Sequence, residues 1–232
     1  MSPPLLSVVI PVYNERGTIE EVLRRVRAVG IASEIIVVDD GSTDGTQEAL
    51  RRLCEHASRD HTRILFQATN RGKGASVRWA FQEARGRIVL IQDADLEYDP
   101  ADYPRLLQPI LNGDADVVFG SRLRQPGYSG SIGQVLGNRV LTSLSNLLTG
   151  LRLTDVYVGY KVFRREVLAQ IRLREDRFGF EAEVTAKVAR GGWRVREVPV
   201  SYRPRTCAEG KKIRLRDALW GLWCIVRYRL AD

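Results

Sequence analysis

Two aspartates close a short apolar run in the segment "RIVLIQDADLEYDP", residues 87–100. In an extended chain the side chains of Asp93 and Asp95 point the same way, while that of Ala94 points to the opposite side. Two carboxylates directed at one ligand suit Mg²⁺ or Mn²⁺, which completes its coordination shell with phosphate oxygens and water. On its own the triplet favours a simple capping role for Asp95, so its meaning depends on the rest of the chain.

The segments around this one alternate between two hydrophobic periods. Short runs rich in Val and Ile predict strands at residues 5–12, 34–40, 62–68, 87–93 and 116–121. Segments of helical period lie between them, at residues 17–29, 43–56, 72–85 and 99–112. This alternation predicts an α/β domain built from βαβ units, with a mostly parallel sheet covered on both faces.

In an open sheet of this kind, ligands bind outside the carboxyl ends of the strands. The first four predicted strands lead into residues 11–15, 39–42, 70–74 and 93–95. Carboxylates follow three of these four ends, and like charges at one edge repel one another unless a cation or hydrogen-bond donors compensate. The sequence therefore predicts a cation-assisted site at this edge.

Composition limits the class of protein. The chain has 232 residues, 44% hydrophobic and 28% charged, which allows one large α/β domain with a sizeable core. Its formal net charge of +8 points to an anionic partner, such as nucleic acid, a phosphorylated substrate or a membrane surface, or else to a merely basic solvated surface. Three cysteines without ligand-like spacing support neither a disulfide framework nor a zinc site and fit a reducing cytosol.

The apolar runs of the sequence predict neither a targeting signal nor a membrane span. The N-terminal segment lacks the basic start and long apolar run of a signal peptide. The longest apolar run elsewhere, residues 218–226, is far shorter than the roughly 20 residues that span a bilayer. No transmembrane helix is predicted.

Four motifs at the strand ends occur in a specific order: "SVVIPVYNE", "IIVVDDGSTDGT", "NRGKGAS" and "IQDADLEYDP". Together they resemble the nucleotide-sugar-binding half of glycosyltransferase family 2. Later segments, including "GYKVFRREVL" and "FGFEAEVTAKVARGGWRVREVPVSYRPR", resemble the branch that contains dolichol-phosphate mannose synthase and related polyprenyl-phosphate glycosyltransferases. The resemblance implies a single GT-A-type, Rossmann-like domain over residues 1–206, followed by a basic, Trp-containing amphipathic helix over residues 207–232.

The resemblance also implies roles for individual residues, transferred position by position. Nucleotide-sugar binding falls on Pro11, Tyr13, Glu15, Asp39, Asp40, Gly72, Lys73, Asp93 and Asp95. A Mg²⁺ or Mn²⁺ ion falls on Asp93, Asp95 and Glu97, and binding of an acceptor phosphate falls on Arg122, Arg139, Ser143 and Arg205. Asp93, Asp95 and Arg205 are the expected catalytic residues.

The positions of the histidines bear on the acceptor. A hydroxyl acceptor needs a general base, most often His. His56 and His61 flank the amino end of the third predicted strand, at the wrong edge of the sheet. A phosphate monoester, with a second pKa of about 6, is already ionised and needs no base. This favours a lipid-phosphate acceptor, with Glu181 or Glu183 as alternative bases for a hydroxyl.

The basic charge gathers near the C-terminus. Residues 202–216 hold six cations against one carboxylate, and Trp220 and Trp223 follow among further arginines. This pattern is typical of an interfacial helix, with aromatic residues at headgroup depth and cations on anionic lipid. A helix that packs its tryptophans on the core is a nearly equal interpretation, because the pattern is apolar on more than one face. Residues 132–151, apolar at helical spacing around Arg139, form a second candidate for lipid contact.

Three functional hypotheses follow. The first is inverting transfer of mannose or glucose, from GDP-mannose or UDP-glucose, to polyprenyl or dolichyl phosphate. The protein would then lie peripherally on the cytoplasmic face of a membrane, would bind no nucleic acid, and could have an integral-membrane partner. The second is a family 2 transferase acting on a saccharide or small-molecule hydroxyl. The third is a non-catalytic basic module that binds nucleotides or nucleic acid.

Overall fold

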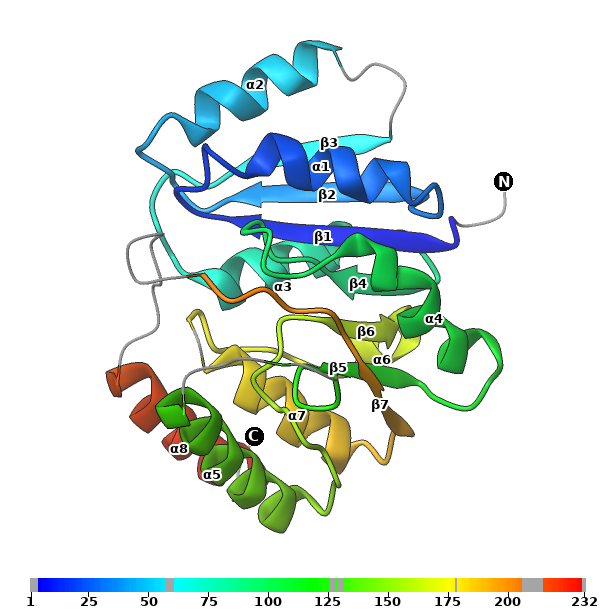
Figure 1. The fold of residues 1–232 in the computed structure, drawn as a ribbon, viewed down its shortest axis with the longest axis vertical. Coiled ribbons are helices and arrows are strands. Elements are labelled where there is room, and N and C mark those ends of the chain that lie inside the picture. The colour runs from blue at the N-terminus through cyan, green and yellow to red at the C-terminus, as the bar shows by residue number, and fades with distance from the viewer. Residues whose placement is uncertain are drawn as a thin grey trace.

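A mixed β-sheet forms the centre of the protein (Figure 1). The computed structural model describes residues 4–56, 61–125, 128, 132–177, 179–205 and 215–230. Within these residues seven strands pair in the order β3-β2-β1-β4-β6-β5-β7. Their bounds are β1 Leu6–Val12, β2 Glu34–Asp39, β3 Thr62–Phe66, β4 Ile88–Ile91, β5 Val117–Ser121, β6 Lys161–Arg164 and β7 Val195–Pro199.

The strand directions confirm the mostly parallel sheet. β1 runs parallel to β2 and β4, β2 to β3, and β5 to β7, whereas β6 is antiparallel to both of its neighbours, β4 and β5. The five predicted strands are all present. The prediction was incomplete, because the sheet also contains β6 and β7, which were not predicted. The carboxyl ends of β1, β2 and β4 share one edge, on the left in Figure 1.

Helices cover both faces of this sheet. They are α1 Ile19–Ala28, α2 Thr46–His56, α3 Lys73–Glu83, the 3₁₀ turn η1 Pro100–Asp102, α4 Tyr103–Leu111, α5 Ile132–Thr149, α6 Arg165–Gln170, α7 Phe180–Arg190 and α8 Leu215–Leu230. α1 shows the governing pattern, because Ile19, Val22, Leu23 and Val26 recur at helical spacing and are all buried. Figure 1 shows α1 and α4 on the near face and α3 and α7 on the far face.

A second, smaller core joins α8 to α7. It consists of Ala182, Ala186, Cys224, Ile225 and Tyr228, with Leu148 of α5 packed against it. α5 and α8 lie side by side, away from the β3 side of the sheet (Figure 1). Of the helices that the structure describes, none is both long enough and apolar enough to cross a membrane. Residues 206–214, which hold several of the predicted basic residues, lie outside the described part of the chain.

Candidate active site

The segment that follows β4 carries Asp93, Asp95 and Glu97 and is called the acid segment below. The buried side chain of Gln92 holds it in place. Gln92 accepts hydrogen bonds from the hydroxyls of Tyr103 and Tyr160, each at 2.8 Å. Its side-chain amide donates to the carbonyl of Asp93 at 2.9 Å. Ala94 is buried, as the strand alternation predicts. These contacts fix the backbone from which the two aspartates leave the sheet.

Asp93 forms an ion pair with a lysine from the glycine-rich loop. Lys73 Nζ lies 2.8 Å from Asp93 Oδ1 and 3.3 Å from Glu181 Oε1. Burial alone would lower the pKa of Lys73, but attraction to these two carboxylates outweighs burial and holds the pKa above its usual value. The cluster joins three parts of the fold: the loop at the start of α3, the end of β4 and the first turn of α7.

Gly159 approaches the Asp93 carboxylate more closely than any other residue type could. A Cβ atom at this position would lie 2.1 Å from Asp93 Oδ2 and 2.8 Å from Cε2 of Tyr98. The backbone N–H of Gly159 also donates to the Tyr98 hydroxyl at 2.8 Å. The glycine is therefore required by close packing against the acid segment.

Gly159→Ala is expected to impair both folding and the site. The added methyl group must push Asp93 away from Lys73, and overpacking of this kind costs about 1 to 3 kcal/mol in the free energy of unfolding. Denaturant unfolding and metal-dependent nucleotide binding measure the two effects. Gly137→Ala on α5 is the matched control, because its new methyl group would meet nothing within 4 Å. Wild-type nucleotide binding by Gly159→Ala would contradict this account.

Arg205 ties the acid segment to the end of β1. Its Nε donates to the carbonyl of Asp95 at 2.8 Å, and its Nη2 lies 2.7 Å from Glu15 Oε2. Its backbone N–H donates to Glu97 Oε1 at 2.8 Å, and the Tyr202 hydroxyl donates to Glu97 Oε2 at 2.9 Å. Both oxygens of Glu97 thus have protein partners, so a metal at Glu97 would share an oxygen that is already bonded.

Asp95 is a partly buried carboxylate that lies beside two other carboxylates, those of Asp93 and Glu97. Burial and the charges of Asp93 and Glu97 raise its pKa to about 7, against a lowering by Arg205. A divalent cation would relieve this repulsion, and carboxylate oxygens are the ligands that Mg²⁺ and Mn²⁺ prefer. Among the described residues, no three His, Cys, Asp or Glu side chains could hold an ion by themselves. A cation at this position would therefore need further ligands, such as donor phosphates and water.

Asp39 and Asp40 shape the edge beyond β2. Asp40 accepts the backbone N–H groups of Arg71 and Gly72, each at 2.8 Å, and so fixes the glycine-rich loop. Asp39 Oδ2 accepts two backbone N–H groups of the turn that follows it. Asp39 Oδ1 is buried without a hydrogen-bond partner in the part of the chain that the structure describes. A buried acceptor of this kind would be satisfied by an N–H group of a nucleotide base.

The residues predicted at the end of β1 divide between strand and loop. Pro11 lies within β1 opposite Val38 of β2. Tyr13 follows the strand and is partly buried, and Glu15 pairs with Arg205 as described above. The predicted nucleotide-sugar residues thus lie along one edge of the sheet.

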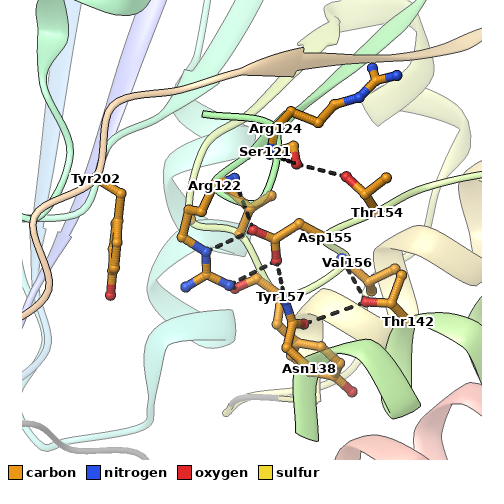
Figure 2. Close-up of polar contacts among 12 residues, drawn as sticks. Ser121, Arg122, Arg124, Asn138, Thr142, Thr154, Asp155, Val156, Tyr157 and Tyr202 are labelled. Atoms are coloured by element: carbon orange, nitrogen blue, oxygen red, sulfur yellow. Dashed lines mark hydrogen bonds and ion pairs between the residues drawn. The ribbon is translucent and has the colours of Figure 1, made fainter. Parts of the chain in front are cut away.

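A second arginine, Arg122, follows β5 at the same edge (Figure 2). Its Nε and Nη2 donate to the two oxygens of Asp155 at 2.7 and 2.8 Å. Asn138 of α5 donates to Asp155 Oδ1 at 2.7 Å, and the Asp155 side chain is fully buried. The guanidinium carbon lies 5.1 Å from the centroid of the Tyr202 ring. Tyr202 also binds Glu97, which forms the acid cluster together with Asp93 and Asp95. One tyrosine therefore contacts both the acid cluster and Arg122.

The structure does not bring every predicted residue to these clusters. Arg139 and Ser143 are exposed on α5, and the α5 side chains in the Arg122 network are Asn138 and Thr142 (Figure 2). His61 precedes the amino end of β3, at the opposite edge, as predicted.

The two glutamates considered as bases have different surroundings. Glu183 is fully buried, accepts the N–H groups of Arg174 and Glu175, and lies 3.0 Å from Lys187 Nζ. It therefore serves the structure of α7. Glu181 is also buried, but its Oε2 lacks a hydrogen-bond partner within the described residues.

Several residues of these clusters were not predicted. They are Tyr98, Asn138, Asp155, Gly159, Lys161 and Tyr202. Burial lowers the pKa of Lys161 to about 8, and its ammonium group donates to the carbonyl of Val158. The signal that could have revealed Tyr202 is its place between a strand and two arginines in "VPVSYRPR".

This geometry defines a class of protein. A mostly parallel sheet with a carboxylate cluster, a glycine-rich loop and arginines at its carboxyl edge is a GT-A-type glycosyltransferase architecture. The sequence pattern described as glycosyl transferase family 2 matches residues 7–172. The chain belongs to this family.

Comparison with individual proteins gives the same fold and family. The chain is 35% identical to undecaprenyl-phosphate mannosyltransferase of Micrococcus luteus over 217 residues, which cover 88% of this chain and 85% of the relative. It is 31% identical to the low-salt glycan biosynthesis hexosyltransferase Agl6 of Haloferax volcanii over 87% of this chain, and spans about half of that protein, 48%. The glucosyl-3-phosphoglycerate synthase of Mycobacterium tuberculosis, solved with Mn²⁺, UDP and phosphoglyceric acid, has the same fold, with a TM-score of 0.76, 22% identity and coverage of 99% and 80% of the two chains.

Proposed function

We propose that this protein transfers mannose or glucose, with inversion, from GDP-mannose or UDP-glucose to a polyprenyl or dolichyl phosphate. The observation that carries the proposal is the position of α5. Its Asn138 braces Asp155 against Arg122, while Leu136, Val140 and Leu147 of the same helix are exposed. A guanidinium beside an apolar helix face suits an acceptor with a phosphate head and a hydrocarbon tail. The Micrococcus relative is named for an acceptor of this class.

The chemistry needs a leaving group and a nucleophile, and no base. An oxygen of the ionised acceptor phosphate attacks C1 of the sugar, and the bond from C1 to the β-phosphate oxygen breaks with its electron pair on the nucleoside diphosphate. A bound Mg²⁺ or Mn²⁺ would neutralise the charge that develops on the diphosphate. Asp95 would hold that ion, with Asp93 and Glu97 beside it, and Arg205, which contacts Asp95 and Glu97, would stabilise the same diphosphate.

The exposed apolar side chains support a contact with lipid. Trp220 and Trp223 of α8 are 47% and 46% exposed, and their rings stack with centroids 4.8 Å apart. Exposed tryptophans on a basic chain suit the interface between water and lipid. We propose peripheral binding of α5 and α8 to the cytoplasmic face of a membrane, where an integral-membrane partner could present the acceptor.

The test is direct transfer of label. Protein, Mn²⁺, polyprenyl phosphate and labelled GDP-mannose or UDP-glucose are incubated, and label is counted in the organic phase. We expect transfer that EDTA abolishes. A parallel incubation contains a soluble saccharide. Label found only on that saccharide would overturn the lipid acceptor and favour the second hypothesis, in which Glu181 offers a base through Oε2, an atom with no hydrogen-bond partner among the described residues. Label that reaches lipid at the same rate in EDTA would overturn the metal.

A further inference from the structure

Glu175 lies between α8 and the glycine-rich loop, and neither the acid cluster nor the Arg122 network contains it. Its carboxylate is turned toward α8. Trp220 Nε1 donates to Glu175 Oε2 at 2.8 Å, and the Tyr228 hydroxyl donates to Oε1 at 2.7 Å. Glu175 is 8% exposed, so its carboxylate is largely shielded from water, and the hydrogen bond from Tyr228 is buried. One buried carboxylate thus holds two points of the helix.

The backbone carbonyl groups of Glu175 and Asp176 face the glycine-rich loop. The N–H group of Ala75 donates to the carbonyl of Asp176 at 3.0 Å. A Cβ atom at Gly74 would lie 2.2 Å from the carbonyl oxygen of Glu175, and one at Gly72 would lie 2.4 Å from that of Asp176. The loop therefore touches residues 175 and 176 so closely that glycine is required at both positions.

Lys73 stands between these two glycines and extends the connection to the acid cluster. Its ammonium group lies 2.8 Å from Asp93 Oδ1, as described above. On the other side of the loop, Asp40 holds the backbone of Gly72. A continuous series of short contacts therefore runs from Trp220 and Tyr228, through Glu175 and the loop, to Asp93.

We infer that Glu175 is a positioning residue through which the seating of α8 controls binding of the nucleoside diphosphate. The inference rests on the proposed function in one respect only, that this diphosphate binds at the carboxyl edge of the sheet. Because Trp220 is half exposed, a lipid surface that contacts α8 would act on the glycine-rich loop through the same hydrogen bond.

Two matched variants test the inference. Trp220→Phe removes the N–H group that binds Glu175, whereas Trp223→Phe removes an equally exposed indole from the same stacked pair. The measurement is the Kd of Mn²⁺ with GDP and, separately, with UDP, by titration calorimetry without lipid. We expect Trp220→Phe to weaken binding about fivefold and Trp223→Phe to match the wild type. Glu175→Gln, which loses one acceptor oxygen, should weaken binding to a similar extent.

A second pair of variants moves α8 without touching Glu175. A Cβ atom at Gly221 would lie 2.3 Å from the hydroxyl oxygen of Tyr157. Gly221→Ala should therefore displace α8 and weaken nucleotide binding, and adding Tyr157→Phe, which removes that oxygen, should restore part of the loss. Circular dichroism of each variant reports whether the fold is retained, so a loss of binding in a folded variant reflects positioning.

The outcomes separate this inference from the proposed function. Wild-type affinity in Trp220→Phe, or equal losses in both Trp variants, would overturn the inference while leaving transfer to lipid phosphate untouched. Nucleotide binding that follows the expected pattern, in a protein that transfers no sugar to lipid phosphate, would confirm the coupling and overturn the acceptor. A wild-type protein that binds neither nucleotide would overturn both.

Discussion

Asp95→Asn is expected to reduce sugar transfer by roughly a thousandfold while making the metal-free protein more stable at neutral pH. The variant keeps the shape of the side chain and loses the charge that would bind the cation. Because Asp95 lies at the rim of the sheet and outside the hydrophobic core, the fold should persist. Transfer of labelled sugar measures the first effect, and urea unfolding in EDTA measures the second.

The sign of the stability effect follows from the raised pKa. The folded protein holds the Asp95 proton up to a pH of about 7, whereas the unfolded chain releases it near 3.8. The contribution of Asp95 to stability is therefore greatest below pH 4 and is lost as the pH rises through 7. Asn has no charge and escapes this loss, so the gain should be on the order of 2 kcal/mol at pH 8 and absent at pH 4.

Two controls make this result specific. Asp114→Asn removes an exposed carboxylate near β5, remote from the acid cluster, and should change neither transfer nor the pH dependence of unfolding. Added Mn²⁺ should stabilise the wild type and not Asp95→Asn. Normal turnover in Asp95→Asn, or equal stabilisation of both proteins by Mn²⁺, would show that the metal assignment is wrong.

The first half of the fold could be predicted because local pattern and tertiary role agree there. β2 is the clearest case, since all six of its residues are buried and its apolar run reads as a strand buried on both faces. In β6 and β7 the local sequence pattern does not indicate the role of the segment in the sheet. β6 has four residues, begins and ends on a cation, and buries the first of them, Lys161. β7 carries two adjacent charged residues, Arg196 and Glu197, so it lacks a clear strand pattern and its place in the sheet depends on pairing with β5.

The residues of the site, like the strands, include some that the sequence predicts and some that it does not. Residues that follow β1, β2 and β4 could be placed from strand order alone, because parallel strands end at one edge. Asp155 could not, because it comes 33 residues after Arg122 and no local pattern joins them. On α5 the prediction named Arg139 and Ser143, whereas Asn138 binds Asp155 and Thr142 binds Asn138 and the Val156 N–H. One residue along a helix is a rotation of about 100°, so a correct helix still leaves the contacting face open.

The C-terminal helix packs on the rest of the protein, but not through its tryptophans as one interpretation expected, and the contact with lipid stays a prediction. Cys224, Ile225 and Tyr228 pack on α7, whereas Trp220 and Trp223 remain half exposed. The sequence shows apolar residues around the helix, and only the position of α7 decides which of them are covered.

Arg122→Ala should lower the free energy of unfolding by about 3 to 5 kcal/mol and abolish transfer to lipid phosphate. Removing Arg122 leaves the carboxylate of Asp155 fully buried with Asn138 as its remaining side-chain partner among the described residues. A buried charge that loses its ion pair is far more unfavourable than a solvated one. Denaturant unfolding measures the stability. The substitution should leave nucleotide binding intact, so normal nucleotide binding without transfer would show that the defect lies in binding the acceptor.

Arg194 provides the matched control, because its side chain also binds an aspartate through two hydrogen bonds. Its Nε and Nη2 donate to the two oxygens of Asp116 at 2.9 and 2.8 Å, but its side chain is 57% exposed, against 15% for Arg122. Water and salt screen such a pair, so Arg194→Ala should cost less than about 1 kcal/mol. Equal losses in the two variants would mean that burial does not set the strength of the Arg122 pair. Arg122→Lys sharpens the test further, because it keeps the positive charge but cannot make both hydrogen bonds, and should recover part of the stability without recovering transfer.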